Sequence, residues 1–97
     1  MDPLEFGKAL ADETRQKIMK VCCCRKLTVT EIVAQIDVTQ PTVSHHLKVL
    51  RDAGLVLTER RGKEIYYTLN QNRVVNGCCQ VADAFAPDHS LEIIRRE

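Results

Sequence analysis

The five cysteines of this 97-residue chain fall in two runs, one of Cys22, Cys23 and Cys24 and one of Cys78 and Cys79. Thiolates bind soft ions, such as Zn, Cu(I) and trivalent metalloids, in preference to hard cations. A trivalent arsenic or antimony centre takes three thiolates in a pyramid, which an adjacent pair and one further cysteine can supply. Neither run has the Cys-x-x-Cys spacing of a zinc ribbon. The residues therefore predict thiophilic-ion binding or thiol chemistry.

The surroundings that the sequence predicts differ among these cysteines. Cys22 falls on the apolar face of a predicted helix, where burial as a small hydrophobe explains it. Cys23 and Cys24 fall at the end of that helix and in the following turn, where polar residues are usual. Cys78 lies on the apolar face of a later helix, and Cys79 lies about 100° further around it, so packing does not explain both. We therefore predict a thiol switch made of Cys23, Cys24, Cys78 and Cys79.

Residues 38–54 have the pattern of a helix with one apolar and one polar face. Val43, Leu47 and Leu50 recur at helical spacing. Thr39 can cap the start, and Gly54 stands where a left-handed residue ends a helix. The polar positions carry side chains that can reach base edges and phosphates without burying a carboxylate against DNA. These positions are Gln40, Thr42, Ser44, His45 and Lys48.

The segments on either side favour a DNA-binding interpretation. Residues 28–36 predict a short helix, which residues 37–39 join to the polar-faced helix, as in a helix-turn-helix. Residues 55–59 and 64–69 are β-prone runs that a four-residue loop with Gly62 can join into a hairpin. Arg60, Arg61 and Lys63 in this loop suit contact with phosphates. Five cations against two acids in residues 40–63 give this region a basic excess, although the net charge of the chain is +1.

The remaining elements follow from periodicity and capping residues. Residues 3–10 predict a first helix, and Asp12 can cap a second that ends near Cys23. Asn70 can cap a last helix that ends near residue 86. Its predicted apolar face consists of Val74, Cys78, Val81 and Phe85. Residues 88–97 give no clear pattern. From the length of the chain and these elements, we expect a single, mainly α-helical domain over residues 1–97 with one small β-hairpin.

These elements resemble the ArsR/SmtB family of winged helix-turn-helix repressors. The resemblance is carried by residues 10–15 (LADETR), 18–19 (IM), 27–32 (LTVTEI), 40–47 (QPTVSHHL), 50–56 (LRDAGLV) and 66–69 (YYTL). It implies a symmetric homodimer formed through the first and last helices. It also implies two recognition helices in successive major grooves of double-stranded operator DNA, and release of that DNA when an inducer binds.

The resemblance also excludes some of the family's inducer sites. Arsenic and cadmium sensors of the family carry Cys-x-Cys where this chain has Thr28 and Thr30. Zinc sensors place Asp/His pairs where this chain has residues 71–73, which are Gln, Asn and Arg. Sensors of reactive sulfur pair two cysteines at positions that align with Lys20 and Ala86. The first two sites are therefore absent from this chain, and its cysteines are shifted relative to the third, which leaves the thiol-redox interpretation open.

The titratable residues outside the cysteines predict no catalytic site. His46 lies near the apolar face of the polar-faced helix, so we expect a structural, hydrogen-bonded histidine. Asp12 and Glu13 are typical of helix capping. The sequence shows neither a nucleophile with its base nor a phosphate-binding glycine loop. We therefore do not expect an enzyme.

The sequence as a whole predicts a repressor that a thiophilic metal or metalloid releases from DNA. Trivalent arsenic is the first candidate inducer and antimony the second. One alternative is a repressor that responds to thiol oxidation or persulfidation without a metal. An alternative of another class is a winged-helix protein-interaction module, against which the basic hairpin argues. Because no targeting signal or membrane-length apolar run is visible, we expect a cytoplasmic protein without membrane contact.

Overall fold

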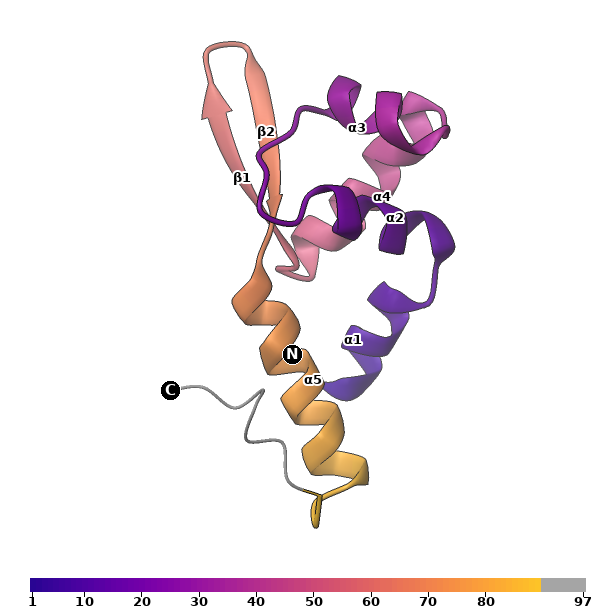
Figure 1. Ribbon diagram of the computed structural model, residues 1–97, viewed down its shortest axis with the longest axis vertical. Coiled ribbons are helices and arrows are strands. Elements are labelled where there is room, and N and C mark those ends of the chain that lie inside the picture. The colour runs from indigo at the N-terminus through magenta and orange to yellow at the C-terminus, as the bar shows by residue number, and fades with distance from the viewer. Residues whose placement is uncertain (90–97) are drawn as a thin grey trace.

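The computed structural model describes residues 1–89, so most of the C-terminal segment without a clear sequence pattern lies outside the described residues. The elements follow the predicted order of a winged helix-turn-helix (Figure 1). They are α1 (Pro3–Leu10), α2 (Glu13–Val21), α3 (Val29–Ile36), α4 (Gln40–Asp52), β1 (Val56–Arg61), β2 (Glu64–Leu69) and α5 (Gln71–Phe85).

The core lies where α2, α3 and α4 pack on one another. Val43, Leu47 and Leu50 of α4 are buried, which confirms the predicted apolar face. They pack in one cluster with Ile18 of α2 and Ile32 of α3. Truncating a buried Leu or Ile to Ala in such a core costs about 2–5 kcal/mol, so this packing holds the polar face of α4 in a fixed orientation.

Side chains cap the helices largely as the sequence predicts. The carboxylate of Asp12 accepts a hydrogen bond from the Arg15 backbone N–H at 3.0 Å, and the Asn70 side chain caps α5 in the same way. Thr39 is the N-cap residue of α4, but its hydroxyl donates to the Thr42 hydroxyl at 3.0 Å instead of accepting from the backbone. The predicted side-chain cap by Thr39 is therefore not formed, and Pro41 leaves Thr42 as the remaining residue whose backbone N–H such a cap could use.

The hairpin has a longer first strand and a shorter turn than the sequence predicts, whereas the second strand, Glu64–Leu69, is where it was expected. Arg61 pairs with Glu64, so only residues 62–63 form the turn, and Arg60 and Arg61 belong to β1. Gly62 has φ +60°, as a tight hairpin turn requires. The prediction of a four-residue loop was wrong because cross-strand pairing, which depends on both runs together, extends the ladder over two charged residues.

A short bridge attaches the hairpin to the segment after α2. The backbone N–H of Leu27 donates to the Tyr67 carbonyl at 2.9 Å, and the Tyr67 N–H donates to the Leu27 carbonyl at 2.7 Å. Helix α2 ends at Val21, earlier than predicted, with Cys22 as its C-cap and Cys24 at φ +65°. The carbonyl of Cys22 accepts from the Leu69 N–H at 3.1 Å. These contacts hold the turn after α2 against the end of the hairpin.

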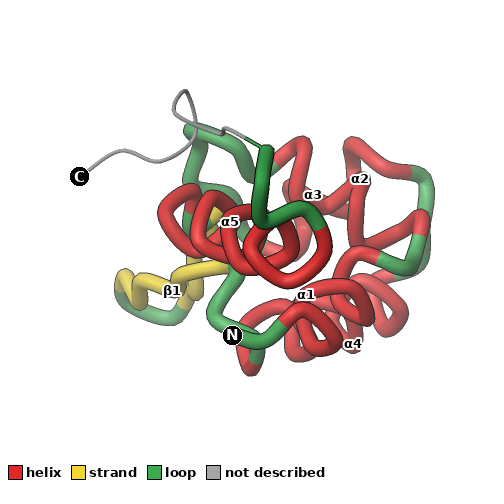
Figure 2. Tube along the Cα trace, turned by 90° about the horizontal axis from the view of Figure 1, so that it is seen from below, coloured by secondary structure: helices red, strands yellow, loops and turns green. Residues whose placement is uncertain are grey.

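Helices α1 and α5 lie against each other at the end of the molecule remote from the hairpin tip (Figures 1 and 2). Gly77 is the buried residue of α5, and a Cβ there would overlap the ring of Phe6. Val74, Cys78 and Val81 are half-buried and pack on the chain's own core. Phe85, which we expected on the same apolar face, is 76% exposed, and Leu4 of α1 is 66% exposed.

Candidate DNA-binding surface and thiol sites

Helix α4 presents its predicted polar residues to the outside of the molecule. The five candidate side chains are all exposed, whereas Val43 and Leu47 between them are buried. The first turn of α4 carries no acidic residue. The positive end of the helix dipole and its free backbone N–H groups are therefore available to a phosphate. The five residues are Gln40, Thr42, Ser44, His45 and Lys48.

The three predicted cations of the hairpin are exposed but differ in their partners. Arg61 forms an ion pair with Glu59 and lies over the Tyr66 ring, with its Cζ 5.1 Å from the ring centroid. The Nε of Arg60 donates to the Gly62 carbonyl at 3.3 Å. Lys63, in the turn, has no acidic partner among residues 1–89. Lys63 is therefore the cation of the hairpin that can meet a phosphate without giving up another contact.

Sequence reasoning missed a fourth cation beside the hairpin. Lys26 lies 2.8 Å from the carboxylate of Glu59, measured from Nζ to Oε1. Its hydrogen bond, and then that of Arg61, lowers the pKa of the Glu59 carboxyl from its ordinary value. The pair links residues 33 positions apart, so no local pattern could have found it.

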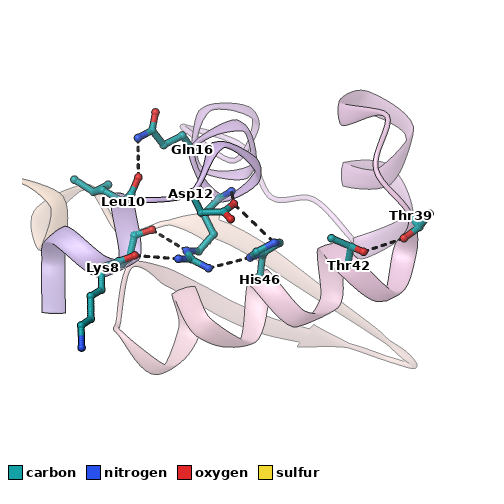
Figure 3. Close-up of polar contacts among 9 residues, drawn as sticks. Lys8, Leu10, Asp12, Gln16, Thr39, Thr42 and His46 are labelled. Carbon is teal, nitrogen blue, oxygen red and sulfur yellow. Dashed lines mark hydrogen bonds and ion pairs between the residues drawn. The ribbon is translucent and has the colours of Figure 1, made fainter.

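His46 connects the polar-faced helix to the N-terminal helices (Figure 3). Arg15 donates to the carbonyls of Lys8 and Ala9, both at 2.9 Å, and its Nη1 lies 3.0 Å from Nδ1 of His46. Arginine has only donors, so Nδ1 accepts and the neutral ring carries its proton on Nε2. Nε2 lies 3.8 Å from a carboxylate oxygen of Asp12. The expectation of a hydrogen-bonded, structural histidine is confirmed.

The end of α4 is tied directly to the start of α5. The Asn70 amide donates to the Gly54 carbonyl at 3.0 Å, and the Arg73 Nε donates to the Ala53 carbonyl at 3.3 Å. Gly54 has φ +76°, as predicted for the residue that ends α4, and its α-carbon faces the Arg73 guanidinium. We name the contacts of Asn70 and Arg73 with residues 53–54 the α4–α5 clamp.

The three cysteines after α2 differ in exposure as the sequence predicts. Cys22 is fully buried, and burial raises the pKa of its thiol to about 11. Cys22 is therefore a neutral core residue near pH 7 and not a thiolate ligand. Cys23 and Cys24 are exposed, and their Sγ atoms lie 3.6 Å apart. Cys78 and Cys79 are half-buried on α5.

One amide ties the exposed cysteine pair to α5. Gln71, the first residue of α5, places its Nε2 3.3 Å from the Cys23 sulfur and 3.1 Å from the Cys24 sulfur. In residues 1–89 of a single chain, no three His, Cys, Asp or Glu side chains are grouped as a metal site. One chain therefore does not gather the four predicted switch cysteines into one site.

Within residues 1–89, no helix is long and apolar enough to cross a membrane.

Comparison with known proteins agrees with this geometry. Residues 12–58 match the family model described as bacterial regulatory protein, arsR family. The chain is 43% identical over 79 residues to an arsenical resistance operon repressor of Bacillus subtilis, covering 74% of each chain. It is 39% identical over 79 residues to a transcriptional repressor SmtB homolog of a Synechocystis strain, covering 81% of this chain and 60% of that protein.

A solved structure with the same fold is the homodimeric winged helix-turn-helix DNA-binding domain of a possible ArsR-family transcriptional regulator from Mycobacterium bovis. The TM-score is 0.69 at 26% identity, and the match covers 91% of this chain and 84% of that one. The exposed polar face of α4, the basic hairpin and these similarities agree with one another. The chain belongs to the ArsR family of bacterial regulatory proteins.

Proposed function

We propose that this protein is a homodimeric repressor that binds double-stranded operator DNA and is released by a thiophilic metal or metalloid. The observation that carries the proposal is the exposure of all eight predicted DNA-contacting side chains on α4 and the hairpin. Trivalent arsenic is the first candidate inducer and antimony the second. Support comes from relatives named as repressors of arsenical resistance operons. The family consists of regulators, so catalysis has no part in this function.

The DNA contacts divide into base reading and phosphate binding. Short polar side chains near the start of a recognition helix suit base edges, whereas cations suit the backbone. We assign Gln40, Thr42, Ser44 and His45 to bases. We assign Lys48, Arg60, Arg61 and Lys63 to phosphates.

The inducer is assigned to Cys23, Cys24, Cys78 and Cys79. A three-thiolate site that includes Cys78 and Cys79 needs a further sulfur from outside their helix, and a second chain of the dimer can supply it. Oxidation within either adjacent pair is strained. Neighbouring α-carbons stand 3.8 Å apart across a trans peptide, whereas disulfides usually span about 4.4–6.8 Å between α-carbons. This strain favours ion binding over a disulfide within either adjacent pair.

Release of DNA requires that the ion bind the DNA-free form more tightly than the DNA-bound form. A tenfold loss of operator affinity corresponds to about 1.4 kcal/mol of coupling, which thiolate coordination can supply. The α4–α5 clamp offers the physical link, because a change in the position of α5 reaches the end of α4 through Asn70 and Arg73.

Operator binding is tested by removing one base-reading pair. We expect Ser44→Ala combined with His45→Ala to cost about 1–3 kcal/mol at the cognate operator. Binding to unrelated duplex DNA serves as the control and stays unchanged, because that binding depends on phosphates. Fluorescence anisotropy with labelled duplexes measures both. Unchanged affinity for the operator contradicts the assignment.

Induction is tested with the same duplex and arsenite. We expect arsenite to release wild-type protein, and the double substitution of Cys78→Ser and Cys79→Ser to abolish release while operator affinity stays intact. Cys22→Ala is the matched control and keeps the response, because Cys22 is buried and neutral. Release by peroxide or polysulfide but not by arsenite supports the redox alternative instead. An intact response after substitution of all four cysteines refutes a sensing role for them.

A further inference from the structure

The exposed pair in the turn after α2 has the geometry of a two-coordinate thiol site. The Sγ atoms of Cys23 and Cys24 lie 3.6 Å apart, and both side chains are exposed. If an atom forms bonds of about 2.3 Å to both sulfurs at that separation, the angle between the two bonds is roughly 100°. This angle lies close to that of a pyramidal or tetrahedral centre. The two sulfurs can therefore chelate one atom with little change in their positions.

A third protein ligand is missing at this pair within the described part of the chain. No third His, Cys, Asp or Glu side chain joins Cys23 and Cys24 as a possible ligand, and Cys22 points into the core as a neutral thiol. The side chain that does contact both sulfurs is the amide of Gln71, which offers N–H donors. A pyramidal arsenic centre bound here must bring its third substituent with it.

The surface beside Cys24 has room for such a substituent. A depression of about 380 Å³ lies between the turn, the hairpin and the start of α5. Leu57, which is 52% exposed, and Leu69 contribute apolar side chains to its wall. Thr68, Asn70 and Asn72 contribute polar ones. An organic group attached to the bound atom would cover Leu57, which is otherwise open to water.

We propose that Cys23 and Cys24 form a binding site for monosubstituted trivalent arsenic compounds, R–As(OH)₂, with the group R in the depression beside Cys24. The two thiols replace the two hydroxyl groups, so that two As–S bonds form, two As–O bonds break and two water molecules leave. Arsenic stays trivalent throughout, and no oxidant or reductant is needed. The inference rests on the proposed function only for its role in induction, because binding at this pair is a property of the chain itself.

The test uses reduced full-length protein with phenylarsine oxide as the probe and glutathione present in excess. The reporter is the variant with Cys78→Ser and Cys79→Ser, in which only the turn keeps an exposed cysteine pair. We expect one phenylarsenic adduct per chain by intact mass spectrometry, with the loss of two thiols that can be alkylated. Peptide mapping should place the adduct on residues 23–24. Adding Cys23→Ser and Cys24→Ser should remove it.

Two further comparisons make the result specific. Leu57→Ala should weaken retention of phenylarsine oxide but leave the retention of arsenite unchanged, because arsenite has no organic group to bury. An adduct on the reporter outside residues 23–24, or none at all, overturns the inference. Operator affinity measured before any arsenical is added separates the two proposals. Normal operator binding without an adduct on residues 23–24 rejects the arsenical site alone, whereas absence of operator binding by untreated wild-type protein rejects the proposed function.

Discussion

Among single residues, the cysteines of the turn after α2 have different chemistries although they are neighbours in the sequence. Cys22 is buried in the core, whereas Cys23 and Cys24 are exposed to water. Burial in a medium of low polarity disfavours a thiolate, which is why the pKa of the Cys22 thiol rises from 9.0 to about 11. The same change of environment protects Cys22 from metal binding and oxidation, which require a thiolate.

The raised pKa of Cys22 predicts a specific loss of stability in alkali. The unfolded chain releases this proton near pH 9 and the folded chain near pH 11, so the stabilising contribution is complete below pH 9 and disappears as the pH rises through 11. The full effect is on the order of 2 kcal/mol. We expect the difference in unfolding free energy between wild type and Cys22→Ala to become smaller by this amount as the pH rises from below 9 to above 11. Urea titrations at the two pH values measure it. A constant difference would contradict the burial of this thiol.

The cations of the hairpin should differ in their contribution to salt dependence. Lys63→Gln should flatten the plot of log affinity for operator against log salt by about 0.9, the value for one lost phosphate contact. Arg61→Gln should flatten the plot less, because Arg61 must leave Glu59 to reach a phosphate. Anisotropy titrations at several salt concentrations measure both slopes. Equal slopes for the two variants would show that the ion pair does not compete with DNA.

Local patterns identify exposure better than they identify partners. The burial of Cys22 and the exposure of Ser44 follow from their positions around a helix. The contact of Gln71 with the Cys23 sulfur joins residues 48 positions apart, and that of Lys26 with Glu59 joins residues 33 apart. Such contacts depend on how whole elements pack, so they could not be predicted from either segment alone.

At the level of elements, the packing of α1 on α5 depends on one small residue. Gly77 faces Phe6, and any side chain there meets the ring. A glycine inside a helical pattern is a sign of close packing, although its partner cannot be read from the sequence. Sequence reasoning missed this residue.

Gly77→Ala therefore tests whether close approach outweighs helix propensity. Alanine favours a helix by up to about 1 kcal/mol over glycine, but overpacking against Phe6 costs about 1–3 kcal/mol. We expect a net loss of stability in thermal or urea unfolding. Gly7→Ala on α1 is the matched control. Nothing lies within 4 Å of its added methyl group, so it should stabilise the protein. Stabilisation by both substitutions would refute the close contact.

The helices and the hairpin follow largely from periodicity, caps and Gly62. The errors concern boundaries. Helix α2 ends early, where the Cys22 carbonyl bonds to Leu69 of the hairpin, and β1 continues through Arg61, where it pairs with Glu64. In both places the partner lies outside the element, 47 residues away for Cys22 and across the turn for Arg61, so no pattern within the element alone could locate the boundary.

In the whole molecule, the exposed apolar residues at the end opposite the hairpin tip predict the dimer surface. On α5, Val74 and Cys78 are half-buried and also pack on the chain's own core. Leu4 and Phe85 are the more exposed apolar side chains on α1 and α5. Apolar side chains left in water on adjoining helices are typical of an interface.

The combined substitution of Leu4→Asp and Phe85→Asp should therefore give a monomer in sedimentation velocity at micromolar concentration. Leu57→Asp on β1 is the matched control and should remain dimeric, because Leu57 is similarly exposed but lies on the hairpin. In the wild-type dimer, recognition helices about 34–36 Å apart would fit successive major grooves and an imperfect palindrome. A wild-type monomer under the same conditions would contradict the dimer.

The α4–α5 clamp has a consequence for how such a regulator can diversify. Asn70 and Arg73 bind the carbonyl oxygens of Gly54 and Ala53, and main-chain carbonyls are present whatever side chains α4 carries. The exposed residues of α4 can therefore be exchanged to recognise a new operator without breaking the link to α5. Gly54 must stay, because its φ of +76° is strained for any residue with a side chain, and a Cβ there would also crowd Arg73. Operator choice and inducer choice can thus evolve, or be engineered, independently.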